Sequence, residues 1–383
     1  MTETREDGRR GKRRVSLARA VMRGAYAARQ ATRVGWYTSQ RLLTARAVES
    51  GDDDADPGEE TKRAETPLPS EPTGGQMARG ARSLMPGLRA LFERDLANAE
   101  AGLYPMPRDA DGGFTQLIAQ TRALFRDLPD ANRRRKAKDG QEVWRKAQET
   151  GEGAGLPRYY LQNFHYQTDG YLTDHSARLY DAQVESLFAG TGNAMRRQAL
   201  VPIAHHVADR DQREIALADI ACGTGRFLRT IREAYPRMKL TGIDLSEAYL
   251  REARRHLERR YPVRLAMGNA EQIPLPDASQ DIVTSVYLFH ELPQKVRRIA
   301  GAEFARILKP GGILVFMDSL QIGDTHGYDR ILESFPGRFH EPYYDNYIRD
   351  DLDAIFAEGG LEPVRHVPAF LSKVSVYRKP DEA

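Results

Sequence analysis

The residues of this chain best suited to hold a ligand lie in a short turn at positions 221–225 and at one aspartate nineteen residues beyond it. The turn reads Ala-Cys-Gly-Thr-Gly, and its small side chains let backbone N–H groups approach a ligand where a helix begins. Asp244 ends the next apolar stretch, where a carboxylate can accept hydrogen bonds from both hydroxyls of a ribose. A dinucleotide site would favour a third glycine at position 228, and Leu228 stands there instead. The pattern therefore favours a nucleoside ligand without a pyrophosphate.

Candidates for proton transfer follow the apolar stretch 281–286, which we expect to be a strand. His290 can act as a general base near neutral pH, with Glu291 orienting it; the alternative is that the pair lines a pocket or supports a loop. Cys222 is more typical of a small packing residue in its turn than of a nucleophile. A single cysteine also excludes a Cys-based zinc cluster within one chain, and the sequence assigns no metal ligands.

An unusual density of aromatic residues occupies positions 159–171. Rings with a polar tip suit either a packed cap or the wall of a pocket, and the sequence leaves both interpretations open. In the second interpretation Tyr160, Tyr166 and Tyr171 are candidates for contact with a substrate.

Strand and helix patterns alternate from residue 214 onward, which is typical of a doubly wound, mostly parallel α/β sheet. The last two expected strands have no helix between them, so one of them must run antiparallel. We therefore expect a seven-stranded sheet preceded by a helical, aromatic-rich cap. The expected strands are 215–220, 240–243, 263–267, 281–286, 312–317, 361–367 and 372–377, and the main helices between them are 225–235, 246–260 and 295–308.

Four motifs within residues 215–318 together resemble one known family. They read DIACGTGRFL, GIDLSEAYL, GNAEQIPLPDASQDIVTSVYLFHELP and RILKPGGILVFMDS, in the order and spacing of class I S-adenosylmethionine-dependent methyltransferases. The chain is most similar to the small-molecule group that includes ubiquinone/menaquinone-type C-methyltransferases. The resemblance implies a Rossmann-like methyltransferase fold, S-adenosylmethionine as the cofactor, and in-line transfer of a methyl group to a small molecule.

The resemblance also implies roles for particular residues. The turn would cradle the methionine part of the cofactor, Asp244 would hold the ribose, Leu245 would pack on the adenine, and Asn269 would meet the adenine edge. Two departures from the family pattern are visible: Ala221 replaces the first glycine of the turn, and Asn269 replaces an aspartate. The implied cofactor contacts are Asp219, Ala221, Cys222, Gly223, Thr224, Gly225, Asp244, Leu245, Asn269, Ala270 and Tyr287.

The methyl acceptor is less determined than the cofactor. Methyltransferases that act on nucleic-acid bases usually carry an Asn/Asp-Pro-Pro-aromatic motif after the fourth strand, and this chain has Tyr287-Leu288-Phe289-His290 there. That difference favours a small-molecule acceptor and no specific nucleic acid. A methyltransferase acting on RNA or protein, and a non-catalytic cofactor-binding partner subunit, stay open as alternatives. Leu228 argues against a nicotinamide oxidoreductase.

The N-terminal segment is distinguished by segregated charge. Residues 9–48 contain eleven Lys or Arg and no acid, whereas residues 49–60 contain seven acids and no base. The basic stretch is compatible with an amphipathic helix on an anionic membrane surface, with a transit peptide, or with a poorly ordered or partner-docking arm. The acidic, Pro- and Gly-rich stretch that follows predicts a flexible linker.

These patterns divide the chain into three parts. We expect a disordered basic and acidic extension at 1–80, a helical cap region at 81–205, and a cofactor-binding domain at 206–383. No apolar run approaches the 18 to 20 residues of a membrane span, so we expect no transmembrane segment. The single cysteine fits a reducing compartment, and we expect a cytoplasmic protein, with peripheral membrane contact through residues 9–48 as the alternative. The remaining chain is close to neutral and lacks the overall basic character of a nucleic-acid enzyme.

Overall fold

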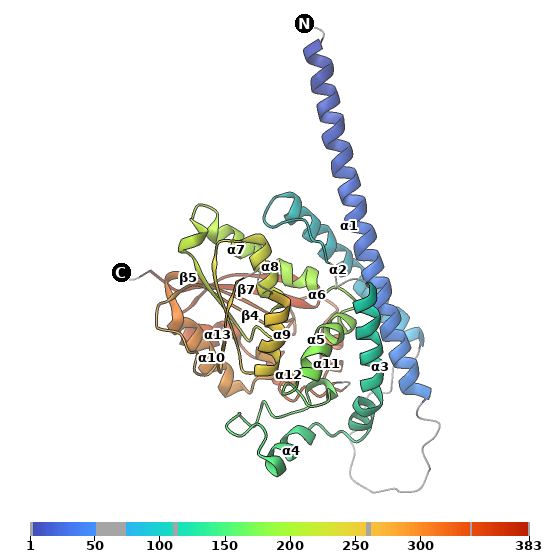
Figure 1. The fold of residues 1–383 in the computed structure, drawn as a ribbon, viewed down its shortest axis with the longest axis vertical. Coiled ribbons are helices and arrows are strands. Elements are labelled where there is room, and N and C mark those ends of the chain that lie inside the picture. The colour runs from blue at the N-terminus through green and yellow to red at the C-terminus, as the bar shows by residue number, and fades with distance from the viewer. Residues whose placement is uncertain (1–2, 51–73, 110–113, 258–261, 338, 382–383) are drawn as a thin grey trace.

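A seven-stranded sheet forms the centre of the molecule (Figure 1). The strand order is β3-β2-β1-β4-β5-β7-β6, in which β1 to β5 pair in parallel and β7 runs antiparallel to both of its neighbours. Only two residues separate β6 from β7, so these strands form a hairpin, as expected. The predicted fold class is therefore confirmed. The strands are β1 Ala216–Ile220, β2 Lys239–Asp244, β3 Arg264–Met267, β4 Gln280–Val286, β5 Leu308–Ser319, β6 Glu362–Ala369 and β7 Ser372–Arg378.

The computed structural model describes residues 3–50, 74–109, 114–257, 262–337 and 339–381.

Helices cover both faces of the sheet, because successive side chains of a buried strand point to opposite sides. In β4, Ile282 joins one apolar core and Val283 joins the other. Both faces are thus filled with apolar side chains, which leaves the carboxyl ends of the parallel strands as the place for polar groups. The first core contains α7 Leu200–Val207, α8 Arg226–Ala234 and α9 Glu247–Leu257; the second contains α10 Gln294–Ile307, α13 Leu352–Glu358 and the short α11 Asp329–Ser334 and α12 Tyr344–Tyr347.

The predicted cap is helical and packs beside the sheet (Figure 1). Its junction with the sheet is continuous, since Leu200 and Ile203 are fully buried in the same apolar core as strand residues. The packing does not break at the predicted boundary between residues 205 and 206, and the three-part division stays a prediction. The cap helices are α2 Gly74–Glu100, α3 Phe114–Lys136, α4 Glu142–Thr150, α5 Asp174–Leu187 and α6 Gly192–Gln198.

Part of the N-terminal extension is docked rather than disordered. Helix α1 spans Glu3–Ser50, and its side chains are described for residues 18–44. Arg33 forms a buried ion pair with Glu185 of α5 (3.0 Å), and the Tyr26 hydroxyl donates to Asp95 of α2 (2.5 Å). For residues 18–44 the prediction of a disordered extension is therefore corrected to a docked helix, whose buried face is largely polar. The inward face, at a spacing of three and four residues, consists of Tyr26, Gln30, Arg33, Tyr37 and Gln40.

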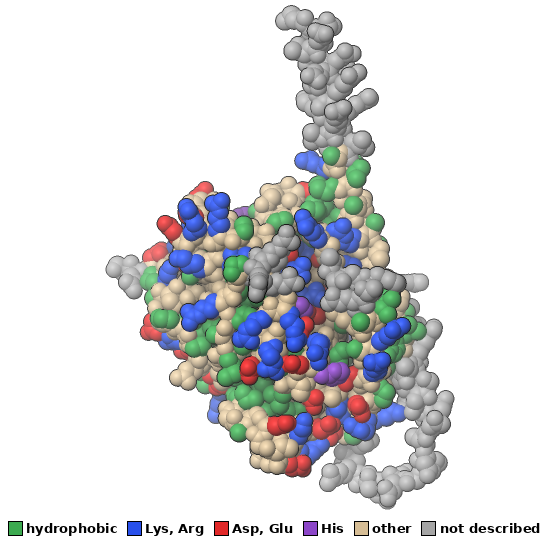
Figure 2. Space-filling view, in the orientation of Figure 1, with side chains coloured by type: hydrophobic (Ala, Val, Ile, Leu, Met, Phe, Trp, Pro, Cys, Tyr) green, Lys and Arg blue, Asp and Glu red, His purple; other side chains and the backbone are tan. Residues whose placement is uncertain are grey.

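The outward face of α1 carries both basic and apolar side chains (Figure 2). Val21, Leu42 and Leu43 are exposed there. Within the described residues, no helix has the length and apolar character that crossing a membrane requires. The predicted linker falls mostly on residues 51–73, which lie outside the described part of the chain.

Candidate active site

The turn after β1 is built on backbone conformations that side chains rarely adopt. Ala221, Gly223 and Gly225 all have positive φ, and α8 begins directly after them. At Gly225 a Cβ would lie 3.1 Å from Cβ of Ala253 in α9, so the glycine lets two helices approach closely. The Cys222 N–H donates to the Ile243 carbonyl of β2 (3.0 Å), which fixes the turn against the neighbouring strand.

Asp244 lies where β2 ends, opposite this turn. The Gly223 N–H donates to its Oδ2 (2.7 Å), and the Ser246 N–H donates to its Oδ1 (2.8 Å). Each carboxylate oxygen has two lone pairs, so one position on each oxygen remains for a ligand. The enclosed position raises the pKa of Asp244 to about 6, against the opposing effect of these N–H groups.

The other polar residues of the turn face away from this point. Asp219 is buried in β1, where it accepts a hydrogen bond from Thr284 of β4 (2.6 Å), and burial raises its pKa to about 7. The Thr224 hydroxyl donates to Asp181 of α5 (2.7 Å). The Cys222 thiol packs in the apolar core, and burial raises its pKa well above the usual value. Of the turn, Ala221 and Gly223 reach the cavity described next.

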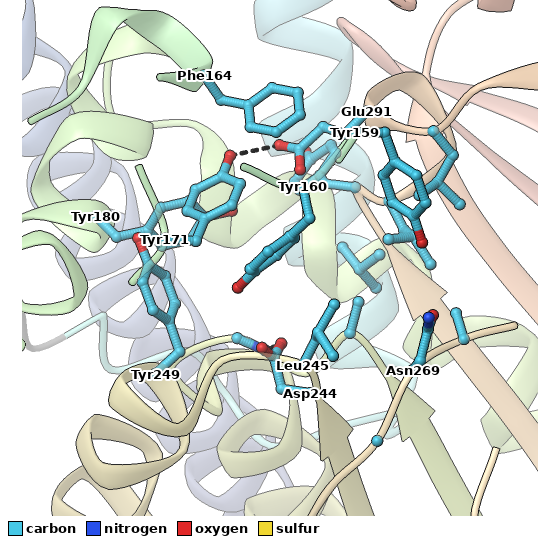
Figure 3. A pocket seen from close by; sticks show the side chains of 18 residues that line it. Tyr159, Tyr160, Phe164, Tyr171, Tyr180, Asp244, Leu245, Tyr249, Asn269 and Glu291 are labelled. Atoms are coloured by element: carbon cyan, nitrogen blue, oxygen red, sulfur yellow. Dashed lines mark hydrogen bonds between the residues drawn. The ribbon is translucent and has the colours of Figure 1, made fainter. Parts of the chain in front are cut away.

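A cavity of about 100 Å³ opens above Asp244, between the strand ends and the cap (Figure 3). Tyr160 and Tyr171 line it, so their predicted contact with a substrate stays a prediction, whereas Tyr166 lies outside it with its ring against His340. The Tyr160 hydroxyl points toward Asp244 and has no hydrogen-bond partner within the described residues. The wall combines seven aromatic residues with other residues at the strand ends: Tyr159, Tyr160, Phe164, Tyr171, Tyr180, Tyr249, Tyr287, Ala221, Gly223, Asp244, Leu245, Gly268, Asn269, Ala270, Val286, Leu288, Glu291 and Leu292.

The end of the cavity near β3 is held by a local turn. Asn269 Oδ1 accepts from the Glu271 N–H (3.0 Å), and its Nδ2 donates to the Glu271 carboxylate (3.1 Å). The Tyr159 hydroxyl donates to the same carboxylate (2.5 Å), which connects the cap to this turn. Asn269 is therefore fixed in place, with Leu245 and Ala270 beside it on the wall.

His290 has a different partner from the one that the sequence suggested. Its Nδ1 lies 2.5 Å from Asp318 at the end of β5, whereas its Nε2 lies 3.9 Å from Glu291 Oε1. Burial alone would lower the pKa of His290, but the Asp318 carboxylate outweighs it and raises the pKa to about 10. Asp318, and not Glu291, orients the imidazole, and Glu291 is the member of the pair that reaches the cavity.

Comparison with known proteins agrees with this geometry. Residues 217–312 match a family model described as a methyltransferase domain. A ubiquinone/menaquinone biosynthesis C-methyltransferase of Syntrophotalea carbinolica is 31% identical over 212 residues, which cover 51% of this chain and 86% of that protein. The chain belongs to the class I S-adenosylmethionine-dependent methyltransferases. S-adenosylmethionine is accordingly its cofactor.

Two further relatives show how much of each protein the similarity covers. A demethylmenaquinone methyltransferase of Geobacillus stearothermophilus is 35% identical over 170 residues, covering 39% of this chain and 72% of that protein. A ubiquinone/menaquinone biosynthesis C-methyltransferase of Methylobacterium nodulans is 31% identical over 165 residues, covering 42% of this chain. Here the match spans 63% of the relative, less than two thirds of its length.

The residues around the cavity fit this cofactor. S-adenosylmethionine carries ribose hydroxyls and positive charge, and Asp244 offers acceptor positions at the cavity wall. Within the described residues, no lysine, arginine or histidine pairs with Asp244, and burial raises its pKa to about 6. Buried carboxylates without a protein cation suit a cationic ligand.

Several residues of the site were not found from the sequence. Tyr180 and Tyr249 line the cavity from α5 and α9, but their helical spacing resembles that of core residues. Asp318 could have been found, because it ends β5 within the last of the four motifs, at the edge where parallel strands present ligand-binding groups.

Proposed function

We propose that this chain transfers a methyl group from S-adenosylmethionine to a small-molecule acceptor by in-line displacement. The observation that carries the proposal is the Asp244 carboxylate, held by Gly223 and Ser246 at the floor of a cavity that aromatic cap residues close. The bound cofactor supplies an electrophilic methyl group on a sulfonium. The work left to the protein is alignment and exclusion of water, which a closed aromatic cavity can provide.

The proposed contacts follow from the cavity wall. Asp244 holds the ribose, and Leu245 and Ala270 contact the adenine beside the fixed Asn269. The backbone at Ala221 and Gly223 faces the methionine part, with Tyr287 on the opposite strand end. Asp219, Cys222, Thr224 and Gly225 act indirectly in this proposal, by fixing the turn.

The acceptor end of the cavity is proposed to lie near Tyr171 and Glu291, away from Asp244. The Tyr171 hydroxyl donates to Glu291 Oε1 (2.6 Å), and both residues line the wall (Figure 3). His290 reaches the acceptor only through Glu291, so its proposed role is to position that side chain and not to contact the substrate.

A small acceptor is favoured over RNA by the location of the basic residues. The basic run 133–136 is the strongest candidate in the cap for a phosphate-binding patch. Its Arg134 is buried, bonded to Glu142 (2.6 Å), and donates to Thr168 (3.0 Å), so this guanidinium is used within the protein.

Two experiments test the proposal. Isothermal titration of the purified chain with S-adenosylhomocysteine and with NADH should give binding only for the first. Incubation with a methyl-labelled cofactor and, separately, a metabolite extract, total RNA and a protein extract should label the small-molecule fraction. Labelling only of RNA or protein would refute the proposed acceptor class, and binding without transfer to any fraction would favour a non-catalytic subunit.

The affinity for the cofactor should depend on pH through Asp244. Ribose hydroxyls donate to the ionised carboxylate, and with the pKa of Asp244 at about 6 the ionised fraction grows as the pH rises. Binding of S-adenosylhomocysteine should therefore strengthen by about tenfold between pH 5 and pH 8, by linkage to one proton. The Asp244→Asn variant should lose this part of the pH dependence. An identical pH profile in that variant would assign the titration to another group, such as Asp219.

The Tyr160 hydroxyl should form a hydrogen bond with the bound cofactor. A buried hydroxyl without a partner is costly in the free protein, so Tyr160→Phe should leave the thermal midpoint unchanged or higher. The same change should weaken S-adenosylhomocysteine by about 1 kcal/mol, or roughly fivefold, because the hydroxyl points toward Asp244. Tyr166→Phe is the matched control and should change neither quantity. A Tyr160→Phe variant with reduced stability and full affinity would make the ring part of the structural core only.

Contact of residues 9–48 with a membrane surface or a partner stays a proposal. The face of α1 that includes Arg33 and Tyr37 is used against the cap. The exposed Val21, Leu42 and Leu43 lie on the remaining surface, where such a contact would form.

A further inference from the structure

Three side chains from distant parts of the sequence converge beside the acceptor end of the cavity. His165 comes from the 3-10 turn Phe164–Tyr166, Glu291 from the 3-10 turn Phe289–Glu291, and Glu341 from the segment before α12. One ligand atom of each, a ring nitrogen or a carboxylate oxygen, lies within 4.8 Å of the others. We call this set the His-Glu-Glu cluster.

Glu341 is the member whose carboxylate has the fewest partners within the protein. Its side chain has no exposed surface, and within the described residues no hydrogen bond reaches either carboxylate oxygen. His165 Nε2 lies 3.0 Å from Oε1, an ion-pair distance. Oε1 is therefore paired with His165, whereas Oε2 has no partner within the described residues, and a buried carboxylate oxygen without a partner is costly.

The surroundings add further negative charge. Asp318 is fully buried just behind His290, so three carboxylates face two imidazoles in this region. Asp318 binds His290 Nδ1, which leaves Nε2 on the side of Glu291. A carboxylate on the far nitrogen of a histidine is the usual support of a metal-binding imidazole.

The backbone at His165 is fixed in a conformation that costs energy. Its φ is 54°, in the left-handed region, and its N–H donates to the His340 carbonyl (3.2 Å), which joins two of the three segments. The edges of Phe335 and Phe339 meet its ring. Strain of this kind persists where the surroundings enforce it, and here it directs the imidazole toward Glu341.

We propose that the His-Glu-Glu cluster binds one divalent transition-metal ion through His165 Nε2 and the carboxylates of Glu291 and Glu341. An imidazole with two carboxylates and no thiolate suits Mn²⁺, Fe²⁺ or Zn²⁺. Three protein ligands leave coordination positions for water or for an oxygen of a bound molecule.

Glu291 also lines the cavity, so the ion would lie at the wall of the acceptor end. An acceptor with a phenol or enol oxygen could bind there and be polarised. This second step rests on the proposed methyl transfer, whereas binding of the ion does not.

The test is a metal titration of the full chain after removal of metal with a chelator. Loss of the electron paramagnetic resonance signal of free Mn²⁺ should report one equivalent bound, and Zn²⁺ should displace it. Glu341→Gln and His165→Gln should each weaken Mn²⁺ by at least tenfold. Glu333→Gln and His366→Gln, which change the same residue types outside the cluster, should bind as the wild type does.

Glu341→Gln decides the question even if the His165 variant fails to fold. Glutamine keeps the shape of the side chain but breaks the buried pair with His165, so the metal-free thermal midpoint of each protein serves as its own baseline, and Mn²⁺ should raise the midpoint of the wild type only. No binding by the wild type, or equal binding by wild type and Glu341→Gln, would overturn the proposal and leave a buried ion pair. Titration with S-adenosylhomocysteine in the same samples separates this result from any failure of the proposed methyl transfer.

Discussion

Replacing Asp244 by alanine should weaken the binding of S-adenosylhomocysteine by about 5-fold to 150-fold, which corresponds to about 1–3 kcal/mol. The carboxylate is held by the N–H groups of Gly223 and Ser246, and Asp244 lines the cavity. Without it, two ribose hydroxyls lose their acceptor inside an enclosed site. Isothermal titration at pH 8, where the wild-type carboxyl is ionised, measures the full difference.

A surface aspartate provides the control for this change. Asp345 forms an exposed ion pair with Arg349 within one helical turn, so Asp345→Ala should retain the wild-type affinity. Thermal denaturation of each variant establishes that it is folded. If folded Asp244→Ala binds as tightly as the wild type, the ribose lies elsewhere and the assignment of the cavity floor is wrong.

Replacing Arg33 by methionine should destabilise the protein by about 3 kcal/mol, at the lower end of the range for breaking a buried ion pair. The change leaves Glu185, which is fully buried, with only the longer contact to Arg196 at 3.3 Å among the described residues. Methionine keeps most of the apolar part of the Arg33 side chain, so the loss of stability measures chiefly the loss of the positive charge. The thermal midpoint should fall by roughly 6–12 °C for a domain-sized cooperative unit.

Arg19→Met is the control, because Arg19 is exposed on the same helix. Cofactor affinity, measured at a temperature where both variants are folded, should stay at the wild-type value, since α1 contributes no residue to the cavity wall. An unchanged midpoint for Arg33→Met would mean that the ion pair between Arg33 and Glu185 adds nothing to stability.

The sequence by itself determined the sheet, and it predicted the turn and the strand end that meet at Asp244. Both depend on signals that are local in the chain: runs of apolar residues with strand periodicity, and a turn whose small residues permit positive φ at Ala221, Gly223 and Gly225. Asp244 could be assigned because its position at a strand end is set by neighbours in sequence, and Ser246, two residues away, supplies one of its two hydrogen bonds.

Tertiary structure alone decided which distant side chains meet. Tyr160 and Tyr166 belong to one aromatic stretch, yet only Tyr160 lines the cavity; Tyr166 lies in the 3-10 turn Phe164–Tyr166 and packs against His340. Likewise α1 has the composition of a loose arm, but partners far along the chain bury its inner face.

The same reason applies to the groups around the acceptor end. His290 lies next to Glu291 in sequence, but Asp318 of a neighbouring strand takes its Nδ1. His165 and Glu341 carry no spacing signal that relates them to Glu291. Periodicity reports the local path of the backbone, whereas contacts between separate segments depend on how complete elements pack, and no short pattern encodes that.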